Sequence, residues 1–240
     1  MTALLRVSDV HVAYGDERVL QGIDLEIPPG EFIALIGPNG SGKTTLLRAL
    51  VGTLPLRRGR VSIGEYHLAA AAREAKGMAG FAVDPAGLPE LLTGRECLAL
   101  FAGARALAGI PPATLGLAET LSLTRVLDRR VATYSLGMRQ KLGILLGLIG
   151  EPPLLLLDEP FNGLDPRSAL AFKQHLVGLV TGGRASVLLA THSLDVVERY
   201  ATKALLLIEG RLRHAWDANE LAALRADPQR SLEQAMSEAC

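Results

Sequence analysis

Residues 37–44 read GPNGSGKT and come directly after the apolar run Phe32 to Ile36. The spacing matches a phosphate-binding P-loop, in which a glycine is followed by any four residues and then by Gly-Lys-Thr. Glycines lack a Cβ, so the backbone can take positive φ angles and curl around an anion with its N–H groups pointing inward. Lys43 supplies a charge for the β- and γ-phosphates, and the Thr44 hydroxyl is suited to hold Mg²⁺. The sequence predicts a nucleotide phosphate site made of Gly37, Pro38, Asn39, Gly40, Ser41, Gly42, Lys43, Thr44 and Thr45.

Two adjacent acids follow a second apolar run, in the segment LLLLDEP at residues 154–160. The carboxyl ends of parallel strands are where such sheets bind ligands, so these acids are expected beside the P-loop. Asp158 is therefore a predicted ligand in the Mg²⁺ shell. Glu159 is a predicted base that polarises a water molecule for attack on the γ-phosphate.

A third segment, YSLGMRQK at residues 134–141, stands just before a strongly apolar helical stretch. Ser135 is a predicted N-cap, and serine and glycine at a helix start form a second anion site. A single nucleotide already held by Lys43 would not need that second site. By composition alone, the same residues describe an ordinary capped helix.

The elements that must position these residues alternate between strands and helices. Alternating apolar residues at 4–12 and 19–27 predict two antiparallel strands, and 203–208 with 211–215 predict a hairpin. Continuous apolar runs indicate strands buried on both faces of a parallel sheet, and right-handed βαβ units connect them. The further strands are expected at 32–36, 60–63, 77–83, 154–157 and 185–190, with helices after Gly42 and over 166–180.

From Leu88 to Ile149 leucine and alanine recur at helical spacing, with a capping box at Thr93 and Glu96 and a helix opened by Pro111-Pro112. The tail shows two further capping patterns, at Asp217 and Ser231, separated by Pro228. The predicted fold is an α/β P-loop NTPase core with a mixed sheet, an N-terminal antiparallel β subdomain and an inserted α-helical subdomain. We expect one domain over 1–240, with a catalytic core at 1–87 and 151–215, a helical subdomain at 88–150 and a helical tail at 216–240.

The composition excludes several classes of protein. The chain has 240 residues, 49% of them hydrophobic, and its 25 basic and 25 acidic side chains balance. A surface that binds nucleic acid normally shows as a basic excess, so nucleic acid is not an expected partner. Cys97 and Cys240 form no metal-ligand pattern and are expected to be reduced, cytosolic thiols. No signal peptide is expected at residues 1–17, and the apolar stretch 142–157 is broken at 150–153, too early to cross a bilayer.

Taken together, the motifs in their order resemble those of ATP-binding cassette (ABC) ATPases, over about Val7 to Gly210. The segment YSLGMRQ resembles the family signature, usually LSGGQ, in the YSxGMRQ variant that is common among bacterial export cassettes. The motifs that carry the resemblance are the P-loop, YSLGMRQ, LLLLDEP, Asn162-Gly163-Leu164-Asp165-Pro166 and Thr191-His192-Ser193.

The resemblance implies a role for each matching residue. Tyr14 matches the aromatic residue that stacks on adenine. Ser135 and Gly137 would contact the γ-phosphate of the nucleotide bound by an opposite subunit, and Asp165 would lie at the subunit interface. His192 matches the switch histidine that contacts the γ-phosphate, so His192, Glu159 and Lys43 are the expected catalytic residues.

Two positions depart from the family pattern. Leu136 stands where the usual signature has glycine. Asp84 stands where a glutamine normally reaches Mg²⁺ and the attacking water, and aspartate is anionic and one methylene shorter. Asp84 is still a predicted metal ligand, although its contact would need a bridging water or a shift of the loop.

The expected function is that of an ATP-binding and hydrolysing transporter subunit that uses ATP and Mg²⁺ and works on export. It would pair with a second cassette, identical or different, and with a separate transmembrane permease, on the cytoplasmic face of the cell membrane. The permease would dock between the helical insertion and the loop at residues 84–92, where Leu88, Leu91 and Leu92 are expected to be exposed. The alternatives are a soluble ABC ATPase that remodels nucleic acid or ribosomes, which the neutral charge disfavours, and a weakly hydrolysing regulatory cassette, which Glu159 and His192 disfavour.

Overall fold

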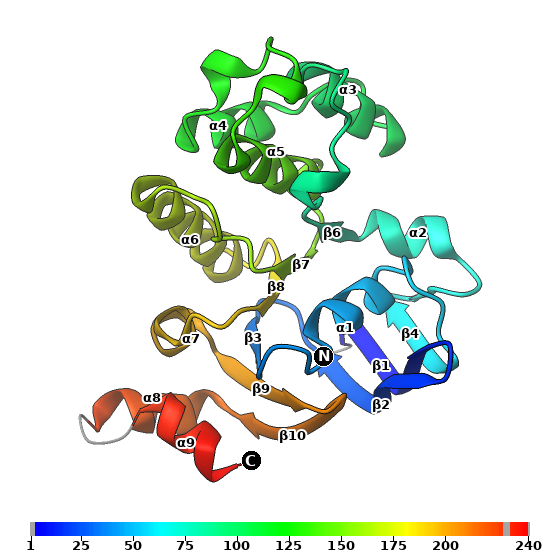
Figure 1. Ribbon diagram of the computed structural model, residues 1–240, viewed down its shortest axis with the longest axis vertical. Coiled ribbons are helices and arrows are strands. Elements are labelled where there is room, and N and C mark those ends of the chain that lie inside the picture. Colours follow the sequence, from blue (N-terminus) through cyan, green and yellow to red (C-terminus); the bar gives the residue numbers. More distant parts are fainter. Residues whose placement is uncertain (1–2, 228–230, 240) are drawn as a thin grey trace.

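Two β-sheets enclose the helix that follows the P-loop in the computed structural model, which describes residues 3–227 and 231–239 (Figure 1). The core between the sheets contains Leu46, Leu47 and Leu50 of that helix, together with Leu5 of one sheet and Leu188 of the other. All five side chains are fully buried. Because the helix is packed from both sides, its first residue holds a fixed place relative to both sheets.

The smaller sheet is antiparallel and has the strand order β2-β1-β4-β5. Alternate residues of β1 are buried, as expected for a strand with one face toward the core. The sheet confirms the predicted N-terminal antiparallel pair and adds a short strand that the sequence did not predict. Its strands are β1 (Leu5–Tyr14), β2 (Glu17–Ile27), β4 (Arg58–Ile63) and β5 (Tyr66–His67).

The larger sheet is mixed, in the order β10-β9-β3-β8-β7-β6. Its neighbours from β9 to β6 are parallel, whereas β10 pairs antiparallel with β9, which confirms the predicted hairpin. Strands β3 and β8 are buried along their whole length, as their continuous apolar runs predicted. The strands are β3 (Phe32–Ile36), β6 (Ala79–Phe81), β7 (Leu154–Asp158), β8 (Ser186–Ala190), β9 (Lys203–Ile208) and β10 (Arg211–Trp216).

The helices fall into three groups, and none of those in the described ranges is both long enough and apolar enough to span a bilayer. The core group is α1 (Lys43–Leu50), α2 (Ala72–Gly77), α6 (Pro166–Thr181) and α7 (Leu194–Tyr200). The group between β6 and β7 stands apart at the top of Figure 1 and consists of α3 (Gly94–Ala104), α4 (Pro112–Thr120) and α5 (Leu136–Leu148), with short 3-10 helices at Pro85–Gly87, Thr124–Val126 and Val131–Thr133. The tail helices are α8 (Ala218–Ala226) and α9 (Leu232–Glu238).

The predicted strand at 77–83 is shorter than expected, because only residues 79–81 pair with β7 and Gly77 instead ends α2. The capping boxes at Asp217 and Ser231 are confirmed at the starts of α8 and α9. The predicted break at Pro228 and the thiol of Cys240 lie outside the described residues. Cys97 is buried as a free thiol.

Glycines bring α5 against the end of β6. A Cβ on Gly143 would lie 2.2 Å from the carbonyl oxygen of Val83, and one on Gly147 would lie 2.8 Å from Ala82. Arg105, at the end of α3, adds hydrogen bonds to backbone carbonyls near β6, including one of 2.7 Å to Ala79. The helical insertion is therefore in close backbone contact with the core at this strand.

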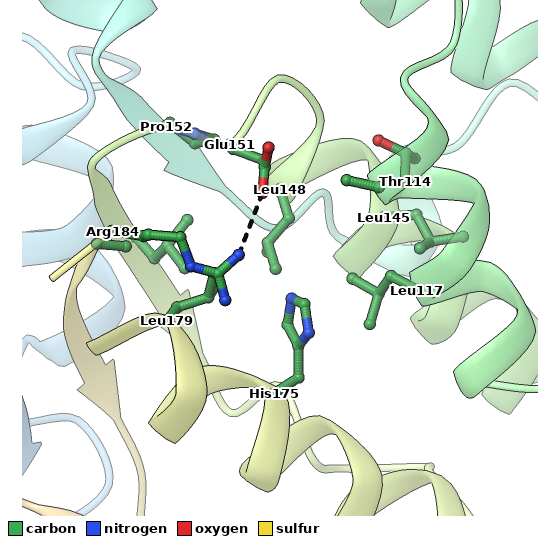
Figure 2. Close-up of a pocket in the computed structure, with 12 residues that line it drawn as sticks. Thr114, Leu117, Leu145, Leu148, Glu151, Pro152, His175, Leu179 and Arg184 are labelled. Carbon is green, nitrogen blue, oxygen red and sulfur yellow. Dashed lines mark ion pairs between the residues drawn. The ribbon is translucent and has the colours of Figure 1, made fainter. Parts of the chain in front are cut away.

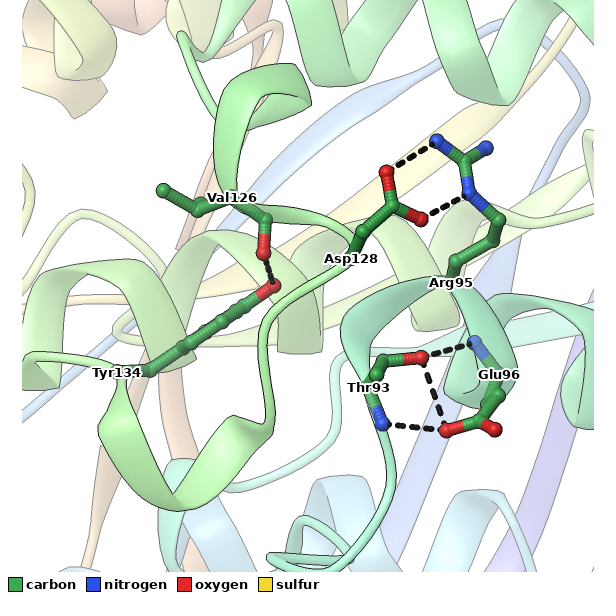
Figure 3. Close-up of polar contacts among 6 residues, drawn as sticks. All are labelled: Thr93, Arg95, Glu96, Val126, Asp128 and Tyr134. Carbon is green, nitrogen blue, oxygen red and sulfur yellow. Dashed lines mark hydrogen bonds and ion pairs between the residues drawn. The ribbon is translucent and has the colours of Figure 1, made fainter.

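Polar contacts order the start of α3 and the segment 126–134, which leads into α5 (Figure 3). The predicted capping box of Thr93 and Glu96 is confirmed, and Arg95 forms an ion pair of 2.6 Å with Asp128. The phenol of Tyr134 donates a hydrogen bond of 2.7 Å to the carbonyl of Val126. Tyr134 immediately precedes Ser135, so its hydrogen bond holds the residue that leads into the signature segment.

A small cavity lies where α4 and α5 meet α6 (Figure 2). His175 of α6 points into it, toward Leu117 and Leu148. Glu151 and Arg184 form an ion pair of 3.7 Å beside it. The cavity therefore combines apolar walls with one titratable ring and one pair of opposite charges.

Candidate nucleotide-binding site

The P-loop connects β3 to α1 and has the backbone shape that its glycines predict. Gly37, Gly40 and Gly42 have φ angles of 150°, 79° and 105°, which residues with a Cβ rarely adopt. A Cβ on Gly37 would also lie 2.1 Å from the carbonyl oxygen of Leu207, so only glycine fits there. The loop forms one wall of a cleft lined by Val19, Asn39, Gly40, Gly42, Lys43, Thr44, Thr45, Asp158 and Glu159.

The ammonium of Lys43 is held at the loop. Its Nζ donates hydrogen bonds of 2.7 Å to the carbonyl of Gly37 and 3.1 Å to the carbonyl of Pro38. Burial lowers the pKa of Lys43, and the carboxylates of Glu159 and Asp158 act in the opposite direction. A cation placed among carbonyl oxygens and acids beside a glycine loop is suited to bind phosphate oxygens.

Asp158 ends β7 next to the start of α1. Burial raises its pKa, and the negative charge of Glu159 adds to that effect, whereas a hydrogen bond from Thr44 lowers it. A carboxylate and a hydroxyl in contact offer the oxygen ligands that Mg²⁺ prefers. A divalent cation here would compensate the burial of the Asp158 charge, so the donor set fits the metal predicted for it.

The side chain of Ser41 is buried in the same loop. Within the described ranges, its Oγ is a buried side-chain atom for which no hydrogen-bond partner is found. An unsatisfied buried hydroxyl is costly and calls for an explanation such as a ligand oxygen. The P-loop residues therefore fit the nucleotide phosphates that the sequence predicted for them.

Glu159 receives contacts from the end of β8. Nδ1 of His192 lies 2.8 Å from its Oε1, and Oγ1 of Thr191 donates a hydrogen bond of 3.2 Å to its Oε2. Its own backbone has a φ angle of 43°, a left-handed conformation that costs energy for a residue with a Cβ. The structure thus brings together the three predicted catalytic residues Glu159, His192 and Lys43, and the carboxylate is oriented from two sides.

The signature segment begins α5, where the predicted N-cap Ser135 accepts a hydrogen bond of 3.3 Å from the backbone N–H of Met138. A Cβ on Gly137 would lie 2.6 Å from the carbonyl oxygen of Gly163, so the segment touches the loop that follows Glu159. Leu136 is 67% exposed.

Asp165 caps α6 and forms an ion pair of 2.7 Å with the buried Lys141 of α5. Lys141, together with a hydrogen bond from Ser168, holds the pKa of Asp165 far below its usual range. The predicted residues Ser135, Gly137 and Asp165 are therefore close to one another, but they are not among the residues that line the P-loop cleft.

The predicted site residues Tyr14 and Asp84 also lie outside the lining of the cleft. Tyr14 ends β1 with its side chain half exposed. Asp84 is exposed, and its carboxylate accepts a hydrogen bond of 2.9 Å from the N–H of Ala86, which caps the 3-10 helix at 85–87. Asp84 thus has a local structural use in this conformation, and its contact with a metal stays a prediction.

The prediction that Leu88 is exposed is wrong. Its side chain is buried in the main core, whereas Leu91 is 83% exposed and Leu92 is partly buried against that core. Sequence reasoning also missed Val19, which lines the P-loop cleft from β2, and Lys141. A strand valine and a helix lysine carry no sequence signal that would single them out.

Comparisons with known proteins agree with this geometry. The profile of the family described as "ABC transporter" matches residues 20–162. "Daunorubicin resistance ATP-binding protein DrrA2" of Streptomyces coeruleorubidus is 36% identical over 209 residues, which are 86% of this chain and 65% of that protein. "Nod factor export ATP-binding protein I" of Paraburkholderia xenovorans is 32% identical over 216 residues, 87% of this chain and 69% of that protein. The chain thus spans about two thirds of the length of these relatives.

A solved structure described as "Structure of ATP binding subunit of ABC transporter" matches over almost the whole chain. It is 32% identical with a TM-score of 0.87, and the match covers 98% of this chain and 99% of that one. The chain belongs to the ABC transporter family and is one of its ATP-binding ATPase cassettes.

Proposed function

We propose that this chain is the ATP-hydrolysing subunit of an exporter and couples ATP-driven pairing of two cassettes to substrate movement by separate membrane subunits. The observation that carries the proposal is that Lys43, Asp158 and Glu159 line one cleft at the glycine-rich loop, with Nδ1 of His192 2.8 Å from Glu159. The names of two relatives, one for daunorubicin resistance and one for Nod factor export, support the direction of transport.

Hydrolysis would rest on the residues that line the cleft. Bound ATP with Mg²⁺ would supply the γ-phosphoryl group, held by the P-loop with Thr44 and Asp158 as metal ligands. Lys43 would neutralise the phosphate oxygens, and Glu159 would accept the proton of the attacking water. His192 would orient Glu159 through their contact and hydrogen bond the γ-phosphate. Asp84 would reach the metal shell only after it leaves its cap on the 3-10 helix.

A second cassette would complete the site. Ser135 and Gly137 begin a helix away from the chain's own P-loop, and the N-terminus of a helix favours an anion. They would therefore contact the nucleotide held by a partner cassette, with Asp165 at the interface. Tyr14, half exposed at the end of β1, would stack on adenine.

The membrane partner would dock on residues 84–92, between the core and the helical insertion. Leu91 is an exposed apolar side chain there. An apolar contact of this kind would let a transmembrane permease follow the movement of the cassette. This arrangement would place the chain on the cytoplasmic face of the cell membrane.

The test is steady-state ATP hydrolysis by the full-length chain with the variant Glu159→Gln, which keeps the size of the side chain and removes its basicity. We expect turnover to fall by roughly 10²- to 10⁴-fold, the range of general acid–base catalysis, while ATP still binds in the presence of Mg²⁺. Glu119→Gln, an exposed acid on α4, is the matched control and should keep full turnover. Unchanged turnover in Glu159→Gln would contradict the proposed role of Glu159.

A further inference from the structure

Three consecutive side chains near the start of α5 reach three different places. The guanidinium of Arg139 forms an ion pair of 2.7 Å with Glu90. Nε2 of Gln140 donates a hydrogen bond of 3.3 Å to the carbonyl of Pro160. Lys141 forms its ion pair of 2.7 Å with Asp165. One turn of helix therefore contacts segments that are about 70 residues apart in the sequence.

The basic ends of both ion pairs are shielded from solvent. The side chain of Lys141 is 11% exposed and that of Arg139 is 20% exposed. The carboxylates remain open to solvent, with Asp165 51% and Glu90 60% exposed, so the packed basic side chains define the geometry of the two contacts. Arg139 and Lys141 thus hold the carboxylates of Glu90 and Asp165 at defined positions.

The segment on the Arg139 side is residues 84–92. It is also held by backbone hydrogen bonds, 3.0 Å from Ala132 to the carbonyl of Glu90 and 2.8 Å from Val131 to that of Leu92. Residues 131–132 lead within three residues into Ser135. This segment is therefore hydrogen-bonded to the residues that lead into the signature.

The segment on the Lys141 side is the loop 160–165, which directly follows Glu159. The N–H of Asn162 donates a hydrogen bond of 3.1 Å to the carbonyl of Glu159, so the loop starts on the residue proposed as base. Asp165 ends the loop as the N-cap of α6. A displacement of Glu159 on nucleotide binding would therefore be transmitted to Lys141 through the six residues 160–165.

We propose that Arg139 and Lys141 are positioning residues that join the segment 84–92 to the loop 160–165, so that nucleotide binding at the P-loop and docking at 84–92 are coupled through the start of α5. The inference rests on the proposed function, because it assigns the two ends of the connection to hydrolysis and to docking. Coupling between two sites is reciprocal, so it is measurable from the nucleotide side alone.

The experiment measures amide hydrogen exchange in the full-length Glu159→Gln chain with and without ATP and Mg²⁺. We expect ATP to slow exchange in two places, the P-loop at 37–45 and the segment 84–92. In Arg139→Gln and in Lys141→Met, tested separately, the response at 84–92 should fall by about fivefold or more, a typical size for coupling between sites. The response at 37–45 should persist in both variants.

Two further variants separate positioning from general damage. Arg95→Gln removes an ion pair of the same insertion that lies outside this connection, the one with Asp128, and should leave both responses intact (Figure 3). The double exchange Glu90→Arg with Arg139→Glu reverses the first pair and should restore the response that Arg139→Gln loses.

Each outcome of the exchange experiment supports or contradicts the inference. A full response at 84–92 in both Arg139→Gln and Lys141→Met would overturn the inference, and so would a parent chain in which ATP protects only 37–45. A loss of protection at 37–45 in those variants would assign the residues to nucleotide binding instead of positioning. If ATP protects neither segment in the parent chain, the proposed function itself fails.

Discussion

Nδ1 of His192 lies 2.8 Å from Oε1 of Glu159, although the two residues come from the ends of different strands. The contact makes His192 the direct neighbour of the proposed base. His192 remains more exposed than Glu159, so its ring is open to a nucleotide.

We expect His192→Ala to lower the turnover number for ATP by about 10²-fold or more, the usual cost of removing one donor to developing charge. The KM for ATP should change little, because Lys43 and the loop amides remain. Steady-state kinetics measure both values. His214→Ala, which removes a histidine from β10, should behave as the parent chain; equal losses in both variants would refute a specific role for His192.

Gly143→Ala should destabilise the fold by about 1–3 kcal/mol, since the added Cβ would lie 2.2 Å from the carbonyl oxygen of Val83. Gly178→Ala is the matched control in α6, where a Cβ has no neighbour within 4 Å. It should be neutral or stabilise by up to about 1 kcal/mol through helix propensity. Urea unfolding of both variants gives the comparison, and similar values would show that α5 does not need glycine.

We expect His175 to lower the free energy of unfolding of the protein at acidic pH. Burial lowers its pKa, and the charge of Arg184 adds to the effect, while Glu151 opposes it (Figure 2). The unfolded chain then binds a proton at a higher pH than the folded chain does. Stability is therefore full above about pH 6.5 and falls as the pH drops from there through the lower pKa of the folded state.

His175→Leu removes that proton-binding site, so its unfolding free energy should decline less steeply than that of the parent chain between about pH 7 and pH 5. Urea midpoints at matched pH values measure the two slopes. Parallel slopes would show that the cavity does not disfavour the charged ring.

Tyr134→Phe should cost about 1–3 kcal/mol, because the partly buried carbonyl of Val126 loses its donor (Figure 3). Burial also raises the pKa of Tyr134 to about 12, which agrees with a phenol that stays protonated in the core. Tyr200→Phe at a partly exposed ring should change stability by less than about 0.5 kcal/mol. A loss no larger than that of Tyr200→Phe would mean that the Tyr134 hydrogen bond contributes nothing.

The sequence predicted the elements that have strong local signals. The buried strands β3, β7 and β8 follow from unbroken apolar runs, and the starts of α3 and α5 follow from side-chain caps at Thr93 and Ser135. These features depend on neighbouring residues only, so they are visible in a single sequence.

Tertiary position was harder to predict. Leu88 and Leu91 look alike in sequence, yet one is buried and the other exposed, because a loop's orientation depends on the core it crosses. The ion pair of Lys141 with Asp165 joins residues 24 positions apart on two helices, and no local pattern encodes it. The cap made by Asp84 is local, but the same residue stands at a position where the family resemblance implies a metal ligand, so the sequence favours the metal over an ordinary turn.

The left-handed backbone at Glu159 lowers the stability of the fold at a residue that the proposed function requires. A glycine there would relax the chain, whereas the glutamate keeps a carboxylate at the cleft at the expense of stability. Selection for thermal tolerance alone would therefore favour the loss of this acid. Directed evolution of a more stable form should therefore screen for ATP turnover as well, because a variant without the proposed base is expected to bind ATP and not hydrolyse it.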